Sequence, residues 1–173
     1  MDAEVRAADP ADIAAIVALR EEVAGELKWI AARPGADADK VAARMEESLD
    51  GPATKVFVAT VDGVIEGSLS IELAPYGVAD FGMFVRATQR GRGLGRLLLE
   101  AALEWARSAG AHKVSLECWP HNTAAIALYR KYGFEEEGRK RRHYRRGGGE
   151  AAWDSVIMGL LLDPDIPGSP YGD

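Results

Sequence analysis

The segment 89–96 has the composition that points most directly to a binding function. Its glycines Gly91, Gly93 and Gly95 fall within five residues, after an apolar run that ends at Val85 and before a segment with helical spacing. A strand, a glycine-rich turn and a helix start leave backbone N–H groups without partners, and the helix dipole there favours negative charge. The segment therefore predicts an anion site, for which a pyrophosphate is a natural ligand.

Two familiar phosphate loops do not fit this segment. A Walker loop requires Lys-Ser or Lys-Thr after its last glycine, and neither follows Gly95. A dinucleotide fingerprint requires Gly-x-Gly-x-x-Gly, and the spacing from Gly91 to Gly95 is different. The alternative to a ligand-binding loop is a glycine-rich turn that only begins a helix.

The pattern Arg90-x-x-Gly93-x-Gly95 resembles the acyl-CoA pyrophosphate loop of the GNAT superfamily of acyl-CoA-dependent N-acyltransferases. Asn122 begins a second match, the Asn-x-x-Ala-x-x-x-Tyr-x-x-x-Gly-Phe helix, which ends at Phe134. The stretch 154–158 is similar to the closing strand of members that act on small substrates. The resemblance extends over about 81–162 and is weak before residue 54.

The resemblance implies acetyl-CoA as the acyl donor. It places the cofactor on the loop, on the backbone of the preceding strand and at the start of the second helix. The residues that it implies for cofactor binding are Phe84, Val85, Arg90, Gly91, Arg92, Gly93, Leu94, Gly95, Arg96, Asn122 and Tyr129. Asn122 also suits an N-cap, which is compatible with a contact to the cofactor.

Acetyl transfer to an amine requires a neutral amine, a donor for the carbonyl oxygen and a proton for the leaving thiolate. Tyr129 occupies the position of the superfamily's acid tyrosine, and a phenol can donate to a thiolate. Glu117 lies five residues before Asn122, as in the ribosomal-protein N-terminal acetyltransferases that this stretch resembles, so it is the candidate base. The alternatives are packing of Tyr129 in the core and a merely exposed carboxylate at Glu117.

Glu26 and Trp29 are the candidates for binding the acceptor. In members of the superfamily that this chain resembles, the region equivalent to its first two helices, residues 13–49, walls the acceptor pocket. A carboxylate beside an aromatic ring suits a cationic amine through charge attraction and cation–π contact. A solvated acidic helix end is the alternative interpretation of this segment.

The bulk composition limits the functional class. The chain has 173 residues, a net charge of −6 and a single cysteine, Cys118. This composition is typical of a soluble globular domain, argues against a nucleic-acid surface and favours a reducing cytoplasm. No run of about 18 apolar residues predicts a membrane span. The three histidines lack metal-ligand spacing, so no metal site is predicted.

The periodicity predicts one α/β domain over 1–162, followed by an irregular tail over 163–173. Helices are expected over 10–27, 41–49, 94–109 and 123–132, with Leu94, Leu98, Ala101, Ala102, Trp105 and Ala109 on one face of the third. Asp62-Gly63 predicts a hairpin, and a last hairpin surrounds Gly147–Gly149. The basic run 139–146 is expected to be a solvent-exposed hairpin arm whose charge is balanced by the glutamates at 135–137. The alternative is a site for a phosphate group. The GNAT resemblance implies a mixed, mostly antiparallel sheet with a central parallel crossover and helices on both faces.

The expected activity is transfer of an acetyl group to the primary amine of a small molecule, either an amine or an amino acid. A protein or peptide N-terminal acetyltransferase is the alternative, because the spacing of Glu117 hints at a peptide N-terminus. A non-catalytic acyl-CoA sensor is a third hypothesis, against which Tyr129 argues. The assembly is left open between a monomer and a homodimer.

Overall fold

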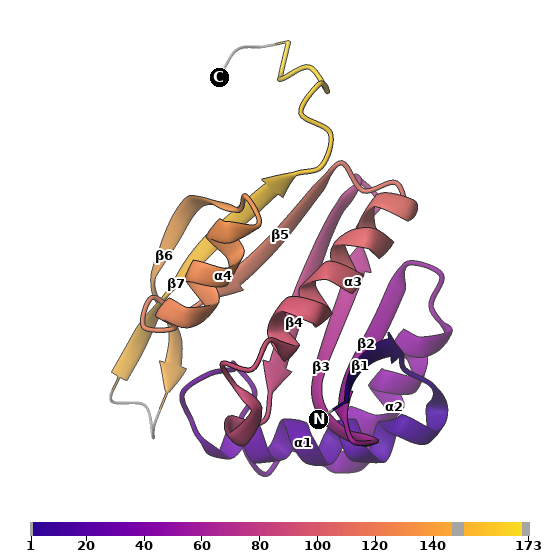
Figure 1. Cartoon of the computed structure of the whole chain (residues 1–173). Helices are drawn as coiled ribbons and strands as arrows, with labels where there is room; N and C mark the ends of the chain where they lie inside the picture. Colours follow the sequence, from indigo (N-terminus) through magenta and orange to yellow (C-terminus); the bar gives the residue numbers. More distant parts are fainter. Residues whose placement is uncertain (1, 147–150, 171–173) are drawn as a thin grey trace.

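A computed structural model describes residues 2–146 and 151–170 of the chain (Figure 1). Its sheet has the order β1-β2-β3-β4-β5-β7-β6, in which only the β4–β5 pair is parallel. This arrangement confirms the predicted mixed sheet with one parallel crossover. The strands are β1 (Ala3–Ala7), β2 (Thr54–Val61), β3 (Val64–Leu73), β4 (Val78–Val85), β5 (Lys113–Cys118), β6 (Glu135–Arg146) and β7 (Ala151–Leu161). The helices are α1 (Ile13–Gly25), α2 (Ala38–Asp50), α3 (Leu94–Ser108) and α4 (Thr123–Lys131).

The parallel pair between β4 and β5 is short. Its register joins Val78 to Lys113, Ala79 to Val114 and Asp80 to Ser115, and goes no further. On its other edge each strand stays paired over more residues, since β4 pairs with β3 as far as Val85 and β5 pairs with β7 as far as Cys118. The facing edges therefore part in the second half of both strands, as Figure 1 shows. A ligand can enter the sheet at this point and use backbone groups that no strand occupies.

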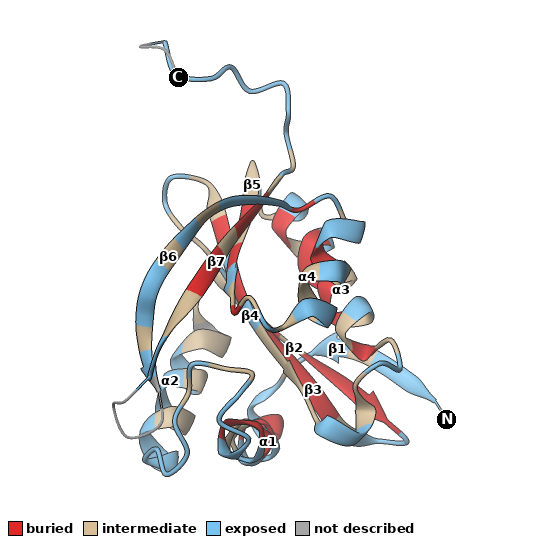
Figure 2. Ribbon diagram, turned by 90° about the vertical axis from the view of Figure 1, so that its left-hand side faces the viewer, coloured by how far each residue is buried: buried red, intermediate tan, exposed pale blue. Residues whose placement is uncertain are grey.

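Helices cover both faces of the sheet, as predicted. Helix α3 packs on β2, β3 and β4, while α1 and α2 pack on the opposite face (Figure 1). The buried residues in Figure 2 run along the strands and along the inner sides of α1 and α3, whereas α2 contributes half-buried residues such as Met45 and Leu49.

The buried face of α3 differs from the prediction at its margin. Leu94, Leu98 and Ala102 are buried as expected. Leu99, Leu103 and Ala106 complete the buried face, whereas Ala101, Trp105 and Ala109 are only half-buried. The three buried residues and the three half-buried residues lie on opposite sides of the row formed by Leu94, Leu98 and Ala102. Helical spacing alone therefore does not determine which side faces the core, an uncertainty of about one residue in the rotation of the helix about its axis.

Turn and cap residues behave as the sequence indicates. Asp9 caps the first helical turn with a capping box that includes Asp12. The pair Asp62-Gly63 has positive φ values of 49° and 81°, which a tight hairpin turn requires. The last hairpin is formed by β6 and β7, which pair from Glu135–Gly159 to Arg146–Ala151. The glycines predicted at its tip lie outside the described residues.

The predicted pairing between the basic run 139–146 and the glutamates 135–137 is wrong. Both segments belong to β6 and extend along one strand, so their charged partners come from neighbouring elements. The observed pairs are Arg139 with Asp154, Lys140 with Glu117, Arg130 with Glu136 and Lys113 with Glu137.

Residues 162–170 contain neither helix nor strand. No helix within the described residues has the length and apolar character that a membrane crossing requires.

Candidate active site

The glycine-rich loop ends in a helix start that is open to an external ligand. Gly91 and Gly93 have φ values of 75° and 93°, which favour glycine, and Gly93 is the N-cap of α3. The first intrahelical hydrogen bond runs from the N–H of Leu97 to the carbonyl of Gly93 over 3.1 Å. The N–H groups of residues 94–96 therefore have no acceptor within the helix. Their position at the positive end of a helix of 15 residues favours an anion.

Gly95 has a different role from the other two glycines. It lies within the first turn of α3, and a Cβ atom there would meet its nearest neighbour, Leu128, only at 3.7 Å. The protein's own packing therefore leaves room for a side chain. Gly95 lines a cavity, so its small size keeps the cavity accessible to a ligand.

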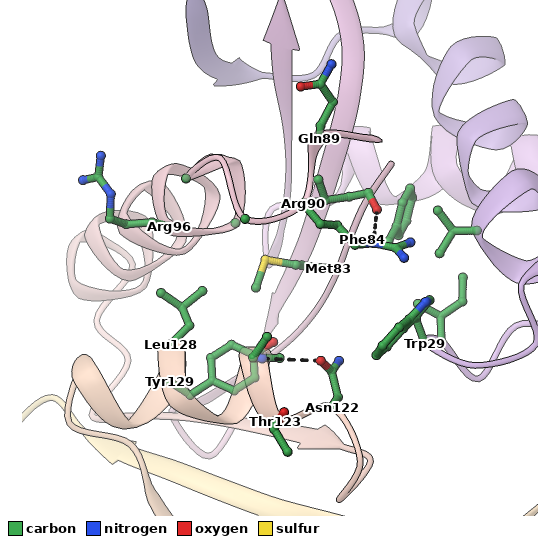
Figure 3. Close-up of a pocket in the computed structure, with 18 of the residues that line it drawn as sticks. Trp29, Met83, Phe84, Gln89, Arg90, Arg96, Asn122, Thr123, Leu128 and Tyr129 are labelled. Atoms are coloured by element: carbon green, nitrogen blue, oxygen red, sulfur yellow. Dashed lines mark hydrogen bonds between the residues drawn. The ribbon is translucent and has the colours of Figure 1, made fainter. Parts of the chain in front are cut away.

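This first cavity has a volume of about 390 Å³ and lies between the loop, the free end of β4 and the start of α4 (Figure 3). Asn122 caps α4 by accepting a hydrogen bond from the N–H of Ala125 over 3.4 Å, and it also lines the cavity. Among the residues that sequence assigned to the cofactor, Leu94 is buried in the core and Arg92 is absent from the lining. The others line it, namely Phe84, Val85, Arg90, Gly91, Gly93, Gly95, Arg96, Asn122 and Tyr129.

Arg90 turns inward and fixes the wall of this cavity. Its Nη atoms donate to both carboxylate oxygens of Glu26, over 2.7 and 2.5 Å, and its Nε donates to the Val85 carbonyl over 2.9 Å. Its guanidinium lies 5.2 Å from the ring centre of Trp29, whose Nε1 donates to Glu26 over 2.7 Å. The segment after α1 is thereby tied to the loop before α3.

The structure thus separates the two residues that sequence assigned to the acceptor. Glu26 is neutralised by Arg90, which holds the pKa of this carboxyl below its usual value, and it lines neither cavity. Trp29 lines both cavities. Glu26 acts on the site through Arg90 and Trp29. The sequence places Glu26 near Trp29 but gives no sign of Arg90, which lies 64 residues further along the chain.

A second cavity of about 340 Å³ adjoins the first. The two cavities share six lining residues, namely Trp29, Ile30, Met83, Phe84, Asn122 and Tyr129. It lies between the α1–α2 connection, the middle of the sheet and the β6–β7 hairpin. Trp119 and Tyr144 supply aromatic walls, with ring centres 6.2 Å apart. No pattern in the sequence assigns a role to Trp119, which lies two residues after Glu117 and just past the end of β5.

Tyr129 stands where the two cavities meet. Its side chain packs against Phe81 and Phe134, with ring centres 5.8 Å away in each case, and the residue is only 6% exposed. Burial raises the pKa of its phenol well above the usual value, so the group stays protonated at neutral pH. Packing and an acid role are therefore compatible, because the ring is buried while the residue lines both cavities.

Glu117 lines the second cavity, held by three partners. The ammonium of Lys140 donates to one carboxylate oxygen, while Ser155 donates to the other over 2.8 Å and Tyr144 over 3.4 Å. Burial by itself raises the pKa of Glu117, but the bonds from Lys140 and Ser155 outweigh it and lower the pKa below its usual value. Glu117 is therefore a charged carboxylate throughout the neutral range.

Comparison with known proteins identifies the family to which the chain belongs. The model of the acetyltransferase (GNAT) family matches residues 19–134. This range includes Tyr129 and most of the residues that line the two cavities. The chain belongs to this family. It is accordingly an acyltransferase, and acetyl-CoA is the acyl donor of its family. A similar solved structure is that of the acetyltransferase YncA of Salmonella typhimurium with acetyl-CoA, which is 26% identical with a TM-score of 0.84. The match covers 98% of this chain and 99% of that one.

Three curated relatives differ in the acceptors that their names give. The L-amino acid N-acetyltransferase AaaT of Escherichia coli is 33% identical over 60% of this chain and 67% of its own length. The aminoglycoside N(6')-acetyltransferase type 1 of Stenotrophomonas maltophilia is 31% identical over 78% of this chain and 88% of its own. For the L-methionine sulfoximine/L-methionine sulfone acetyltransferase of Pseudomonas aeruginosa, at 38% identity, the match spans only half of each chain. Within the described residues, no cluster of His, Cys, Asp and Glu could hold a metal ion.

The anion site at the start of α3 can be tested by placing a charge on it. Gly95→Asp is expected to weaken acetyl-CoA binding about 100-fold or more, because a carboxylate a few ångströms from a phosphate costs several kcal/mol even in a polar surrounding. Gly95→Asn has the same size without the charge and is the matched control. Calorimetric titration with acetyl-CoA measures both. Equal affinity of the Asp variant and the unchanged protein would place the pyrophosphate elsewhere.

Proposed function

We propose that this protein transfers the acetyl group of acetyl-CoA to the primary amine of a small molecule. The observation that carries the proposal is the position of Tyr129 at the junction of two cavities, one leading to the helix-start anion site and the other to Glu117. A donor in the first cavity and an acceptor in the second would meet beside a protonated phenol.

The reaction requires few groups beyond these. The amine attacks the thioester carbonyl as a neutral nucleophile, and an N–H on the free edge of β4 can stabilise the oxygen as it becomes negative. When the tetrahedral species collapses, the C–S bond breaks and the thiolate accepts a hydrogen bond and then a proton from Tyr129. Glu117 holds the incoming ammonium, and the proton leaves the amine toward this carboxylate or toward water in the cavity.

The shape of the second cavity supports a small acceptor over a peptide N-terminus. Arg33, from the α1–α2 connection, donates to the carbonyl of Arg145 on β6 over 3.2 Å. Ala32 and Tyr144, which flank these two residues in the chain, both line the cavity. This hydrogen bond connects two segments that bound the cavity, whereas an extended peptide requires an open groove.

The acid role of Tyr129 predicts a specific kinetic change. Tyr129→Phe is expected to lower kcat by about 10- to 10⁴-fold, the usual contribution of a positioned acid, while acetyl-CoA affinity stays the same. The ring keeps its contacts to Phe81 and Phe134, so the fold is preserved. Stopped-flow or single-turnover assays on a screened amine, together with calorimetry, separate the two effects. An unchanged single-turnover rate would restrict Tyr129 to packing.

The lowered pKa of Glu117 predicts where its titration appears. Its carboxylate is charged above a pKa that lies below the usual 4.5, so activity that depends on it is present at neutral pH and disappears only in stronger acid. Glu117→Gln should therefore lower kcat/KM by a constant factor of about 10 to 10⁴ across pH 6–9 without moving an inflection in that range.

The exposed Glu104, which lines neither cavity, provides the control Glu104→Gln. The pH dependence of kcat/KM is the measurement. An inflection near neutral pH that vanishes in Glu117→Gln alone would contradict the lowered pKa, and an unchanged kcat/KM would remove Glu117 from the mechanism.

A further inference from the structure

The second cavity contains two charged side chains among its described lining residues, and they come from different elements. Glu117 enters from β5 and Arg20 from α1, which packs on β3 and β4. The other lining residues are mostly apolar, with Ile30, Met45, Phe81, Met83, Phe84 and Leu116 among them. The polar residue Ser70, on β3, also lines this cavity.

These two charges are not equally compensated. Glu117 is paired with Lys140. Arg20 is half-buried, and over 2–146 and 151–170 it has neither an ion-pair partner nor a hydrogen bond from its guanidinium. The neighbouring arginines behave differently, since Arg86 pairs with Glu22 and Glu66, and Arg90 pairs with Glu26. The cavity therefore carries one uncompensated positive charge.

Arg20 is a half-buried residue whose guanidinium has no partner among the described residues, so its hydrogen-bonding capacity is not used by the protein itself. Its five N–H donors are forked to match a carboxylate or a phosphate, and burial makes an unpaired charge costly. The first cavity already offers a helix start to the phosphates of the donor, so the anion that Arg20 would receive belongs to the acceptor. The charge of Arg20 and a hydroxyl donor such as Ser70 in the same cavity suit a carboxylate.

We propose that Arg20 binds a carboxylate of the acceptor, and that the acceptor is an amino acid with an apolar side chain. This inference rests on the proposed function. The amine lies toward Glu117 and Tyr129, the carboxylate toward Arg20 and Ser70, and the side chain against the apolar walls. Arg20 sets specificity and takes no part in the chemical step, because it lies outside the cavity that would hold the thioester.

The test compares acids with matched neutral acceptors. The twenty L-amino acids and their α-carboxamides serve as acceptors, with release of free CoA as the readout, for the full chain and for Arg20→Gln, Arg20→Lys and Arg44→Gln. Arg44 is exposed and lines neither cavity, so Arg44→Gln controls for the loss of one positive charge. Affinity for acetyl-CoA is measured in parallel by calorimetry.

The unchanged protein is expected to prefer at least one apolar amino acid over its carboxamide by about 10- to 100-fold in kcat/KM, the effect of one charge-assisted hydrogen-bonded pair. Arg20→Gln should remove this preference through a higher KM for the acid, with kcat and acetyl-CoA affinity preserved. Arg20→Lys should restore part of the preference, and Arg44→Gln should leave it unchanged.

Other outcomes overturn the inference in distinguishable ways. If carboxamides or simple amines react as well as acids, or if Arg20→Gln lowers both equally, Arg20 does not bind a carboxylate while acetyl transfer stands. If acetyl-CoA binds but neither set reacts, the small-molecule acceptor and the role of Arg20 fail together.

Discussion

The limited pairing of β4 with β5 is the constraint on which the site depends. Three residue pairs join the strands, and beyond Asp80 and Ser115 each strand keeps only its outer neighbour. The break leaves backbone groups free in the middle of the sheet and opens it toward both faces. The first cavity uses the free end of β4 and the second uses the free end of β5. Pairing of the two strands to their ends would occupy the backbone groups that this part of the site leaves available to a ligand.

Electrostatic pairing then distinguishes the two cavities. Around the first, the charges are already matched by protein partners, since Glu26 neutralises Arg90, and the positive end of α3 is left to attract an anion. Around the second, Lys140 neutralises Glu117 while Arg20 stays without a partner among the described residues. In the proposed function the donor and the acceptor would be selected by different kinds of positive charge, a helix end in one case and a forked guanidinium in the other.

Local patterns in the sequence predict the parts of the site that depend on neighbours along the chain. The glycine-rich turn before α3, the capping by Asn122 and the position of Tyr129 on α4 all follow from spacing within a few residues. The mixed sheet and its crossover follow from the order of these elements together with the family resemblance.

The remaining features depend on residues that are distant in sequence. Glu26 has the right type and position for an acceptor site, but Arg90 occupies it from another part of the chain. The partners of Glu117, Lys140 and Ser155, come from β6 and β7, and no periodicity reveals which face of the hairpin meets β5. Arg20 is a helix residue like many others until the fold brings it to the cavity.

A crystal structure of the protein with acetyl-CoA tests the central claim most directly. The account predicts that the pyrophosphate accepts hydrogen bonds from the N–H groups of residues 94–96, and that the pantetheine arm lies between the separated ends of β4 and β5. It also predicts that the thioester sulfur lies within hydrogen-bonding distance of the Tyr129 hydroxyl. A thioester bound away from Tyr129, or a cofactor that leaves the gap between the two strands empty, would contradict it.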